Sequence, residues 1–339
     1  MQVNEIRLTG QAITSTNYTT KKMFKFTPPY VKAMAERFLA CGVNEVEIPQ
    51  GVLDPEKKFP EQGVDLETLK ETLAALPVET KVIGSYLGGQ GVGKDNAGYL
   101  KKQQQALSLL VEYFPDMSYV ALHPAGRDFG DRDNICRIVE TFAKLAEHAG
   151  GLRGDFQLCF HNHYDSSGET AEQVSTYLAE IEKVNSPHLR WGPDTGHCHG
   201  MGDRYMEVLE KYAHLIGDFF HIKARVPAFD SLHGGDQYEP DRDIWRNPAE
   251  VGRGLYSGFV NAADPEIQTP FKEIFKIIAE KARPVSGIVR GAMEIDVPRQ
   301  HPQLEILCEV LYMKNVHGIE GGLKLSNDEI IRRAFGVSS

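Results

Sequence analysis

Histidines and carboxylates recur in this sequence directly after short apolar runs. A single histidine in such a place is most often a satisfied core or rim residue. Here ionisable residues end several apolar runs in succession, so independent accident is a poor explanation. The residues are Glu47, His123 in LHPAG, His161 and His163 in CFHNH, Asp194 and His197 in GPDTGH, His221, Lys223 and Arg225 in FFHIKAR, and Glu294 and Asp296 in GAMEID.

These residue types point to metal chemistry. Carboxylate and imidazole together suit Mn²⁺, Fe²⁺, Co²⁺ or Zn²⁺, whereas Mg²⁺ prefers a shell made of oxygens. We therefore expect one divalent cation, with Mn²⁺ favoured. His161 and His163 are two residues apart, so in a strand they share one face, with Asn162 on the other. This spacing leaves open whether both contact the cation or one is a general base.

The elements that must position these residues follow a simple alternation. Runs rich in β-branched and aromatic residues predict strands over residues 4–8, 43–49, 81–87, 119–123, 156–163, 189–194, 219–225 and 287–296. Segments of 3.6-residue period between them predict helices over residues 28–41, 65–76, 97–114, 131–149, 169–184, 205–216, 269–282 and 303–316. Gly150 and Gly151 are expected to close the fourth helix.

Eight alternating strand–helix units predict a parallel sheet, and eight strands are the number that closes a barrel. We expect one domain over residues 1–339, a (β/α)₈ barrel, with an open doubly wound sheet as the alternative. Residues 319–339 would form a C-terminal tail. The carboxyl ends of barrel strands carry the active site, so the strand-end residues should meet there.

A long segment, residues 226–268, follows the seventh strand on this catalytic side. It is rich in Gly, Pro and Asp, yet it contains five large aromatic residues: Phe229, Tyr238, Trp245, Tyr256 and Phe259. A βα connection needs only a few residues, so a segment of this length suggests a lid or a surface that docks a partner.

Composition excludes other functional classes. The 339 residues carry a net charge of −10 with no dense basic run, which disfavours a nucleic-acid partner. No segment approaches the roughly 18 consecutive apolar residues of a membrane span. The five cysteines are scattered without a CxxC motif, and the first residues lack the pattern of a signal peptide, so we expect a cytoplasmic protein with reduced thiols.

A glycine-rich stretch after the third strand resembles a phosphate-binding loop. Residues 88–94 have the sequence GGQGVGK. The next residue is Asp95, where a phosphate loop needs Ser or Thr to hold Mg²⁺. We interpret the stretch as a glycine-rich barrel loop and expect no ATP site.

The segments GPDTGH, FFHIK and GAMEI resemble the xylose-isomerase-like TIM-barrel superfamily, over roughly residues 1–318. That superfamily includes sugar isomerases and epimerases, inosose dehydratases and metal-dependent abasic-site endonucleases. The resemblance implies Asp194, His221 and Glu294 as metal ligands. We expect His161 or His163 to complete the shell. The resemblance also implies that His197 contacts substrate hydroxyl groups.

The fifth strand departs from the superfamily's pattern. Many members have Glu-Asn-His, with the glutamate as a metal ligand, where this chain has His161-Asn162-His163. Glu169, at the start of the next helix, could replace the missing carboxylate. In the epimerases of the superfamily, carboxylates from strands five and eight form the acid–base pair. The absence of the strand-five carboxylate here argues against a plain two-base epimerase.

Within the superfamily, the chain most resembles the large catalytic subunits of bacterial C-glycoside deglycosidases. The shared features are the aromatic segment 226–268, the HNH replacement and a long N-terminal connection over residues 9–27. Those enzymes cleave the carbon–carbon bond between a 3-keto-glucosyl unit and a phenolic aglycone by elimination, and they pair with a small β-sandwich subunit. The resemblance therefore implies a metal-dependent lyase with a small second subunit or a homo-oligomeric partner.

A stand-alone sugar or inositol isomerase, epimerase or dehydratase is the alternative. In either case we expect His163 to act as the acid–base group, with His161 nearer the metal and Glu294 as the next candidate base. The residues expected to contact the substrate are His123, His197, Lys223, Arg225 and Glu169.

Overall fold

The strands form the predicted parallel barrel. The computed structural model describes residues 1–11, 28–48, 66–89, 91–163, 166–223, 269–294 and 302–337. The strands are β1 (Glu5–Gln11), β2 (Glu45–Ile48), β3 (Lys81–Leu87), β4 (Tyr119–Leu122), β5 (Gln157–Phe160), β6 (Leu189–Trp191), β7 (Phe219–Ile222) and β8 (Ile288–Met293). Their order is β6-β5-β4-β3-β2-β1-β8-β7, with parallel pairing throughout. Isolated bridges Trp191–Ile216 and Asp194–His221 join the two ends, so the (β/α)₈ prediction is confirmed.

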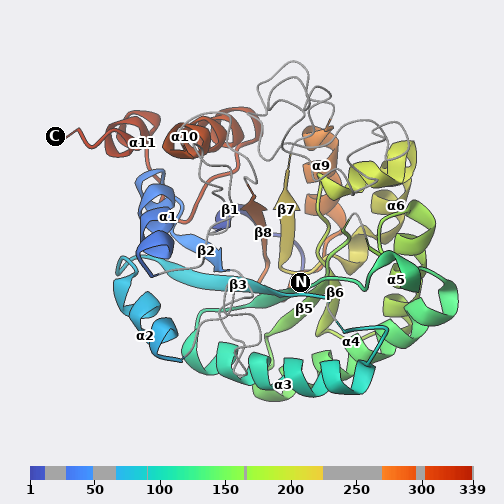
Figure 1. The fold of residues 1–339 in the computed structure, drawn as a ribbon. Coiled ribbons are helices and arrows are strands. Elements are labelled where there is room, and N and C mark those ends of the chain that lie inside the picture. Colours follow the sequence, from blue (N-terminus) through green and yellow to red (C-terminus); the bar gives the residue numbers. More distant parts are fainter. Residues whose placement is uncertain are drawn as a thin grey trace, which may run out of the picture.

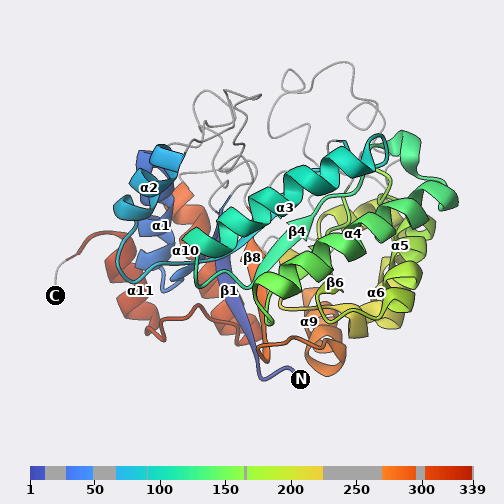
Figure 2. The same cartoon turned by 90° about the horizontal axis from the view of Figure 1, so that it is seen from below.

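Helices surround this barrel (Figure 1). They are α1 (Pro28–Ala40), α2 (Leu66–Ala75), α3 (Asn96–Tyr113), α4 (Arg132–Leu152), α5 (Ala171–Val184), α6 (Tyr205–Tyr212), α9 (Phe271–Lys281), α10 (Pro302–Tyr312) and α11 (Asn327–Ala334). Figure 2 shows α3, α4 and α5 following one another around the outside. No helix in the described ranges is long and apolar enough to cross a membrane.

Two apolar layers support the barrel. Buried side chains between strands and helices form the large outer core, and a small inner cluster fills the barrel itself. Inside, the ring of Tyr119 stacks on Phe219, with centroids 4.4 Å apart and an interplanar angle of 16°. His221 stands edge-on to Phe219 at 4.7 Å. This aromatic pair closes the barrel beneath the strand-end residues.

Ion pairs organise the opposite end of the barrel, where the strands begin. Glu45 on β2 accepts hydrogen bonds from Arg7 on β1 (2.8 Å) and from Arg290 on β8 (2.9 Å). Arg290 also lies 3.8 Å from the carboxylate of Asp218, just before β7. These contacts tie four neighbouring strands together and keep the register that positions their other ends.

Several strands end earlier than the sequence predicted. β5 ends at Phe160 and β6 at Trp191, so His161 and Asp194 lie in the connections that follow the strands. Pro193 has no N–H to donate, which prevents regular pairing just before Asp194. These candidate ligands therefore lie just beyond the ends of their strands.

The prediction that Gly150 and Gly151 end the fourth helix is wrong, because α4 continues to Leu152. The imidazole of His188 packs against Gly150, where a Cβ atom would overlap it. His188 Nδ1 donates a hydrogen bond to the carbonyl of Phe156 at 2.9 Å, which holds the ring in place. Gly150 serves this close approach, while a Cβ at Gly151 would meet open space.

Residues near the C-terminus pack on the barrel. Glu320 pairs with Arg7 in an isolated bridge, and its carbonyl accepts a hydrogen bond from the N–H of Leu8 at 2.9 Å. Ile319 and Ile330 are buried, and α11 contacts α1 and α10.

The two glycines of α4 provide a matched pair for a stability measurement. We expect Gly151→Ala to stabilise the protein by about 0.5–1 kcal/mol, since alanine is the better helix former. Gly150→Ala should be less stable than Gly151→Ala by about 1–3 kcal/mol, because the methyl group displaces His188. Urea unfolding of both variants measures the difference, and equal stabilities would show that His188 moves without cost.

Candidate metal centre

Three of the predicted ligands meet at the mouth of the barrel. Asp194 follows β6, His221 lies within β7 and Glu294 follows β8. His221 Nδ1 lies 3.0 Å from Glu294 Oε2 and 3.5 Å from Asp194 Oδ2. One potential ligand atom from each of the three residues lies within 4.8 Å of the others, which is close enough for one cation to bind all three.

The turn that carries Asp194 explains why its carboxylate faces inward. Asp194 Oδ1 accepts hydrogen bonds from the N–H groups of Gly196 (2.7 Å) and His197 (2.8 Å). Aspartate commonly caps turns and short helices in this way. One oxygen is thereby used in the turn, and Oδ2 is left buried without a hydrogen bond.

Asn162 holds the same turn from the β5 side. Its Oδ1 accepts hydrogen bonds from the N–H of Asp194 (3.2 Å) and from Trp191 Nε1 (3.3 Å), and its amide donates to Cys198 Sγ (3.4 Å). Asn162 therefore positions Asp194.

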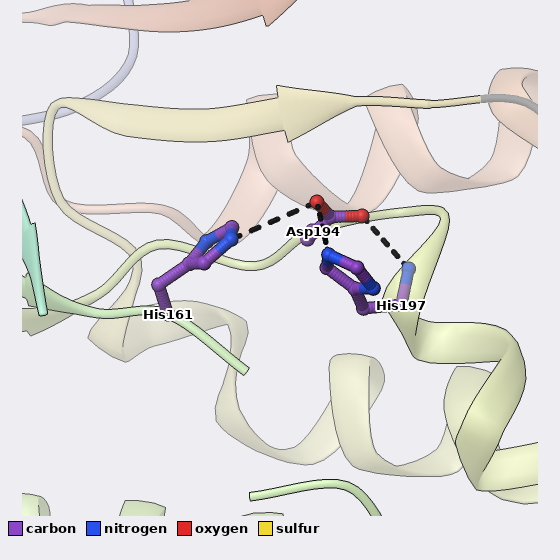
Figure 3. Close-up of side chains that lie close together, drawn as sticks. All are labelled: His161, Asp194 and His197. Carbon is purple, nitrogen blue, oxygen red and sulfur yellow. Dashed lines mark hydrogen bonds and ion pairs between the residues drawn. The ribbon is translucent and has the colours of Figure 1, made fainter. Parts of the chain in front are cut away.

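A second group shares the same aspartate. His161 Nε2 lies 3.7 Å and His197 Nε2 lies 3.5 Å from Asp194 Oδ2, and the three side chains point toward one another (Figure 3). His161 Nδ1 donates to the carbonyl of Gly192 at 3.1 Å. A carbonyl can only accept, so the proton is on Nδ1 and the lone pair of Nε2 faces Asp194.

Glu47 has a role here that sequence reasoning did not assign. Its Oε2 accepts a hydrogen bond from His221 Nε2 at 2.9 Å. This contact places a proton on Nε2, which leaves Nδ1 as the atom that would bind a cation, as expected of a metal-ligating histidine with a carboxylate behind it. Burial lowers the pKa of His221, but Glu47 and Glu294 outweigh it and hold this pKa well above the usual value, so a cation would take the place of the Nδ1 proton. The available signal was the place of Glu47 in a short apolar strand, EVEI, which the structure shows to be buried throughout.

Lys223, two residues beyond His221, places its ammonium among these groups. Its Nζ lies 2.7 Å from Glu294 Oε2, 3.5 Å from Asp194 Oδ2 and 3.3 Å from His197 Nε2. The side chain is 2 % exposed. Gly196 makes room for it, since a Cβ there would lie 2.6 Å from Lys223 Cβ.

Burial and neighbouring charges determine the protonation of the site. Burial would raise the pKa of Asp194, but His197 and Lys223 hold it well below the usual value. Burial likewise opposes ionisation of Glu294, and Lys223 and His221 outweigh it, so the pKa of Glu294 is lowered. Burial lowers the pKa of His161 to about 3, which leaves this imidazole neutral and able to act as a ligand.

These residues fit a divalent cation. Asp194 Oδ2, His221 Nδ1 and Glu294 Oε2 are all buried and make no hydrogen bond of acceptable geometry, although Lys223 contacts the two carboxylates as an ion pair. Buried polar atoms without hydrogen bonds require an explanation, and a bound ion is one. A donor set of carboxylate and imidazole suits Mn²⁺, Fe²⁺, Co²⁺ or Zn²⁺.

Two further predicted residues, His123 and His163, lie beside the candidate ligands. His123 and His163 join the site as a wall of rings: the centroid of His163 lies 4.0 Å from that of His197 and 4.9 Å from that of His123. His123 in turn stacks on Tyr86 at 5.3 Å. Both histidines are partly buried.

Glu169 pairs with Arg127 and does not join the candidate metal ligands. Both of its carboxylate oxygens accept hydrogen bonds from Arg127, at 2.9 and 3.0 Å, and neither candidate metal group includes it. The structure therefore does not support Glu169 as a substitute for the strand-five carboxylate. Arg225, Asp296 and the segment 226–268 lie outside the described residues.

Comparisons with known proteins agree with the fold. The family described as "Xylose isomerase-like TIM barrel" matches residues 35–282. Among solved structures, the probable 3-DHS dehydratase AsbF from Bacillus anthracis has a TM-score of 0.59 at 13% identity, covering 92% of this chain and 100% of its own. IolI with a bound zinc atom has a TM-score of 0.58 at 14% identity (92% and 98% covered).

A D-allulose 3-epimerase from Methylomonas sp. has a TM-score of 0.53 at 14% identity, covering 99% of this chain and 98% of its own. Identities this low show a common fold alone. No curated protein sequence matches the chain.

Removing either charged ligand should release the cation. We expect Asp194→Asn and Glu294→Gln each to weaken binding of Mn²⁺ or Zn²⁺ more than the 10–100-fold typical of an outer-shell change. Glu169→Gln is the control, because Glu169 pairs with Arg127, and its metal content should equal that of the wild type. Metal analysis after dialysis measures all three, and retention of one equivalent in both ligand variants would contradict this site.

Proposed function

The chain belongs to the xylose isomerase-like TIM-barrel family, and from this premise we propose that it is a divalent-metal-dependent lyase acting on a keto-sugar. In this proposal it removes a proton next to the keto group and expels the substituent β to it. The observation that carries the proposal is a cation site of carboxylates and imidazole bordered on the β5 side by histidines.

The charges of the described residues support a resident cation. The carboxylates of Glu47, Asp194 and Glu294 meet at the barrel mouth, and within the described ranges Lys223 is the ammonium that faces them. Uncompensated buried charge is costly. A divalent cation bound to neutral imidazoles would bring this group to neutrality. We propose Mn²⁺ as the physiological cation.

The residues that follow β5 support a lyase over a two-base epimerase. His161 and His163 follow β5 where the epimerases of the resemblance have a carboxylate, and Glu169 is engaged by Arg127. The described site thus lacks a carboxylate from strand five to oppose Glu294. A base on one side and a histidine that passes a proton to a leaving group fit elimination better than reprotonation on the opposite face.

The proposed mechanism assigns a task to each side chain. A bound divalent cation would polarise the keto oxygen and so acidify the neighbouring C–H. His163, partly buried and in ring contact with His197 and His123, accepts that proton. Lys223 and His197 orient oxygen atoms of the sugar. The electron pair of the broken C–H bond forms a carbon–carbon double bond as the bond to the β substituent breaks, and the leaving group takes a proton.

We propose 3-keto-C-glycosides as the substrate class. There the bond that breaks joins the anomeric carbon to an aromatic carbon of the aglycone, and the products are an unsaturated keto-sugar and a phenol. Support comes from the resemblance of the sequence to the large subunits of C-glycoside deglycosidases. The proposal includes a small second subunit that docks on the 226–268 segment and helps wall the aglycone pocket.

A sugar or inositol isomerase, epimerase or dehydratase is the second candidate. The solved structures of similar fold favour it, because they include a probable dehydratase and a 3-epimerase. Both candidates share the cation and the first proton transfer, and they differ in whether a bond to a leaving group breaks.

Product analysis separates the candidates. With Mn²⁺ and a 3-keto-C-glycoside of a chromophoric phenol, we expect phenol and unsaturated keto-sugar in equal amounts, because each elimination yields one of each. A chelator should abolish the reaction and added Mn²⁺ should restore it. Exchange of a substrate C–H for deuterium and epimer formation without phenol would favour the second candidate, and neither reaction in the metal-loaded protein would argue for a non-catalytic role.

The base can be tested separately. His163→Ala should lower the rate of C–H exchange by about two orders of magnitude or more, the usual contribution of a general base. Its metal content should be unchanged, because His161 faces Asp194 and His163 does not belong to either candidate metal group. His214→Ala, which removes a surface contact with Glu182, is the control. Exchange at the wild-type rate in His163→Ala would place the base elsewhere, with Glu294 next.

A further inference from the structure

Two neighbouring connections at the mouth of the barrel are fastened to each other. The first follows β4 and begins with His123, and the second follows β5 and carries His163. Since β4 and β5 pair as parallel neighbours, the two connections leave the sheet side by side. The centroids of the two imidazole rings lie 4.9 Å apart. The position of His163 relative to His123 therefore depends on the contacts between the two connections.

A bidentate ion pair joins these connections. Arg127 Nε and Nη2 donate hydrogen bonds to the two carboxylate oxygens of Glu169, at 2.9 and 3.0 Å. The side chain of Glu169 is 13 % exposed and that of Arg127 is 40 % exposed. Ion pairs at a surface contribute little in general, but two parallel hydrogen bonds from a guanidinium fix both the direction and the distance of the carboxylate. This pair is therefore suited to hold a loop in one position.

The backbone links the ion pair to His163. Glu169 directly follows Gly168, whose carbonyl accepts a hydrogen bond from the N–H of His163 at 3.3 Å. Ser166 Oγ donates to the carbonyl of His163 and accepts from the N–H of Gly168, the latter at 3.0 Å. These bonds hold Gly168 against His163. A contact that fixes Glu169 therefore also fixes the backbone of His163.

Backbone contacts keep the second connection on the first. The N–H of Ser167 donates to the carbonyl of Ala125 at 2.8 Å. A Cβ atom on Gly168 would lie 3.1 Å from Pro124 Cγ, so the two chains approach closely here. Because these contacts involve the backbone, the ion pair is the tie that a side-chain substitution can remove.

We propose that Arg127 and Glu169 form a clasp that positions His163 for proton transfer. The inference rests on the proposed function in taking His163 as the base. A base must lie within hydrogen-bond reach of the proton that it accepts, and a displacement of about 1 Å can cost about 100-fold in rate. Glu169 is thus a positioning residue in place of the substrate contact expected from the sequence, because both of its oxygens are engaged by the guanidinium.

The first test is C–H exchange in the Mn²⁺-loaded protein with a 3-keto-C-glycoside. Glu169→Ala and Arg127→Ala should each lower kcat for exchange by about tenfold or more, with KM and metal content unchanged. The double variant should be no slower than either single variant, since the second substitution removes a contact already lost. In a His163→Ala background, Glu169→Ala should have no further effect. Glu172→Ala, which removes an exposed ion pair with Arg204, is the matched control and should exchange at the wild-type rate.

The second test needs no substrate, so it separates the clasp from the proposed function. Selective ¹³C labelling of histidine gives a Cε1–H resonance for His163, identified by its loss in His163→Ala. With Zn²⁺ in place of paramagnetic Mn²⁺, this resonance should shift or broaden in Glu169→Ala and Arg127→Ala, and it should stay unchanged in Glu172→Ala. Arg127→Lys serves if Arg127→Ala does not fold, because lysine keeps the charge and loses the paired hydrogen bonds.

The outcomes distinguish the two proposals. An unchanged His163 resonance in both clasp variants would overturn the clasp and leave the proposed function intact. A higher KM with an unchanged kcat in Glu169→Ala would show that Glu169 binds the substrate directly, which also contradicts the clasp. No exchange in the wild type, with the resonance shifted in the clasp variants, would contradict the proposed function and still support the positioning of His163.

Discussion

Buried negative charge at the mouth of the barrel is the constraint on which the rest of the site depends. Glu47, Asp194 and Glu294 bring three carboxylates into a region nearly closed to water, and Lys223 is the ammonium that faces them in the described structure. Such groups are stable only when each is paired, hydrogen-bonded or bound to metal. The turn hydrogen bonds to Asp194 Oδ1 and the contact of Glu47 with His221 satisfy part of this need. The remaining buried oxygens, Asp194 Oδ2 and Glu294 Oε2, still require positive charge beside them.

The barrel brings these carboxylates together because the carboxyl ends of all eight parallel strands lie at the same mouth. The stack of Tyr119 on Phe219 closes the interior below the site, so the ligand atoms lie above an apolar floor. Arginine–glutamate pairs at the opposite end hold β1, β2 and β8 in register without competing for the cation. The ion pairs that stabilise the barrel thus lie at one end of its axis, and the candidate metal ligands lie at the other.

The exchange of a carboxylate for histidine on β5 changes what this scaffold can do. His161 contributes a neutral ligand atom whose tautomer is set by the carbonyl of Gly192. The site therefore gains no further negative charge from the residues that follow β5. His163 and His123 extend the group of rings around His197.

The sequence by itself determined the fold class and the identity of the principal candidate ligands. Alternating strand and helix patterns are local, and they predicted eight parallel strands whose apolar runs end at Asp194, His221 and Glu294. The boundaries were less accurate, because a histidine or aspartate after an apolar run has the same pattern whether it ends the strand or begins the loop. Gly150 and Gly151 likewise have the pattern of a helix stop, and only the packing of His188 shows that the helix continues.

Tertiary structure alone decided the partners. His221 donates to Glu47 across 174 residues of sequence, Lys223 lies between Glu294 and His197, and Glu169 is engaged by Arg127. Sequence patterns report which residue types follow one another, and they carry periodicity because backbone geometry repeats locally. They do not report which of several inward-facing charges will touch, because closure of the barrel sets those distances.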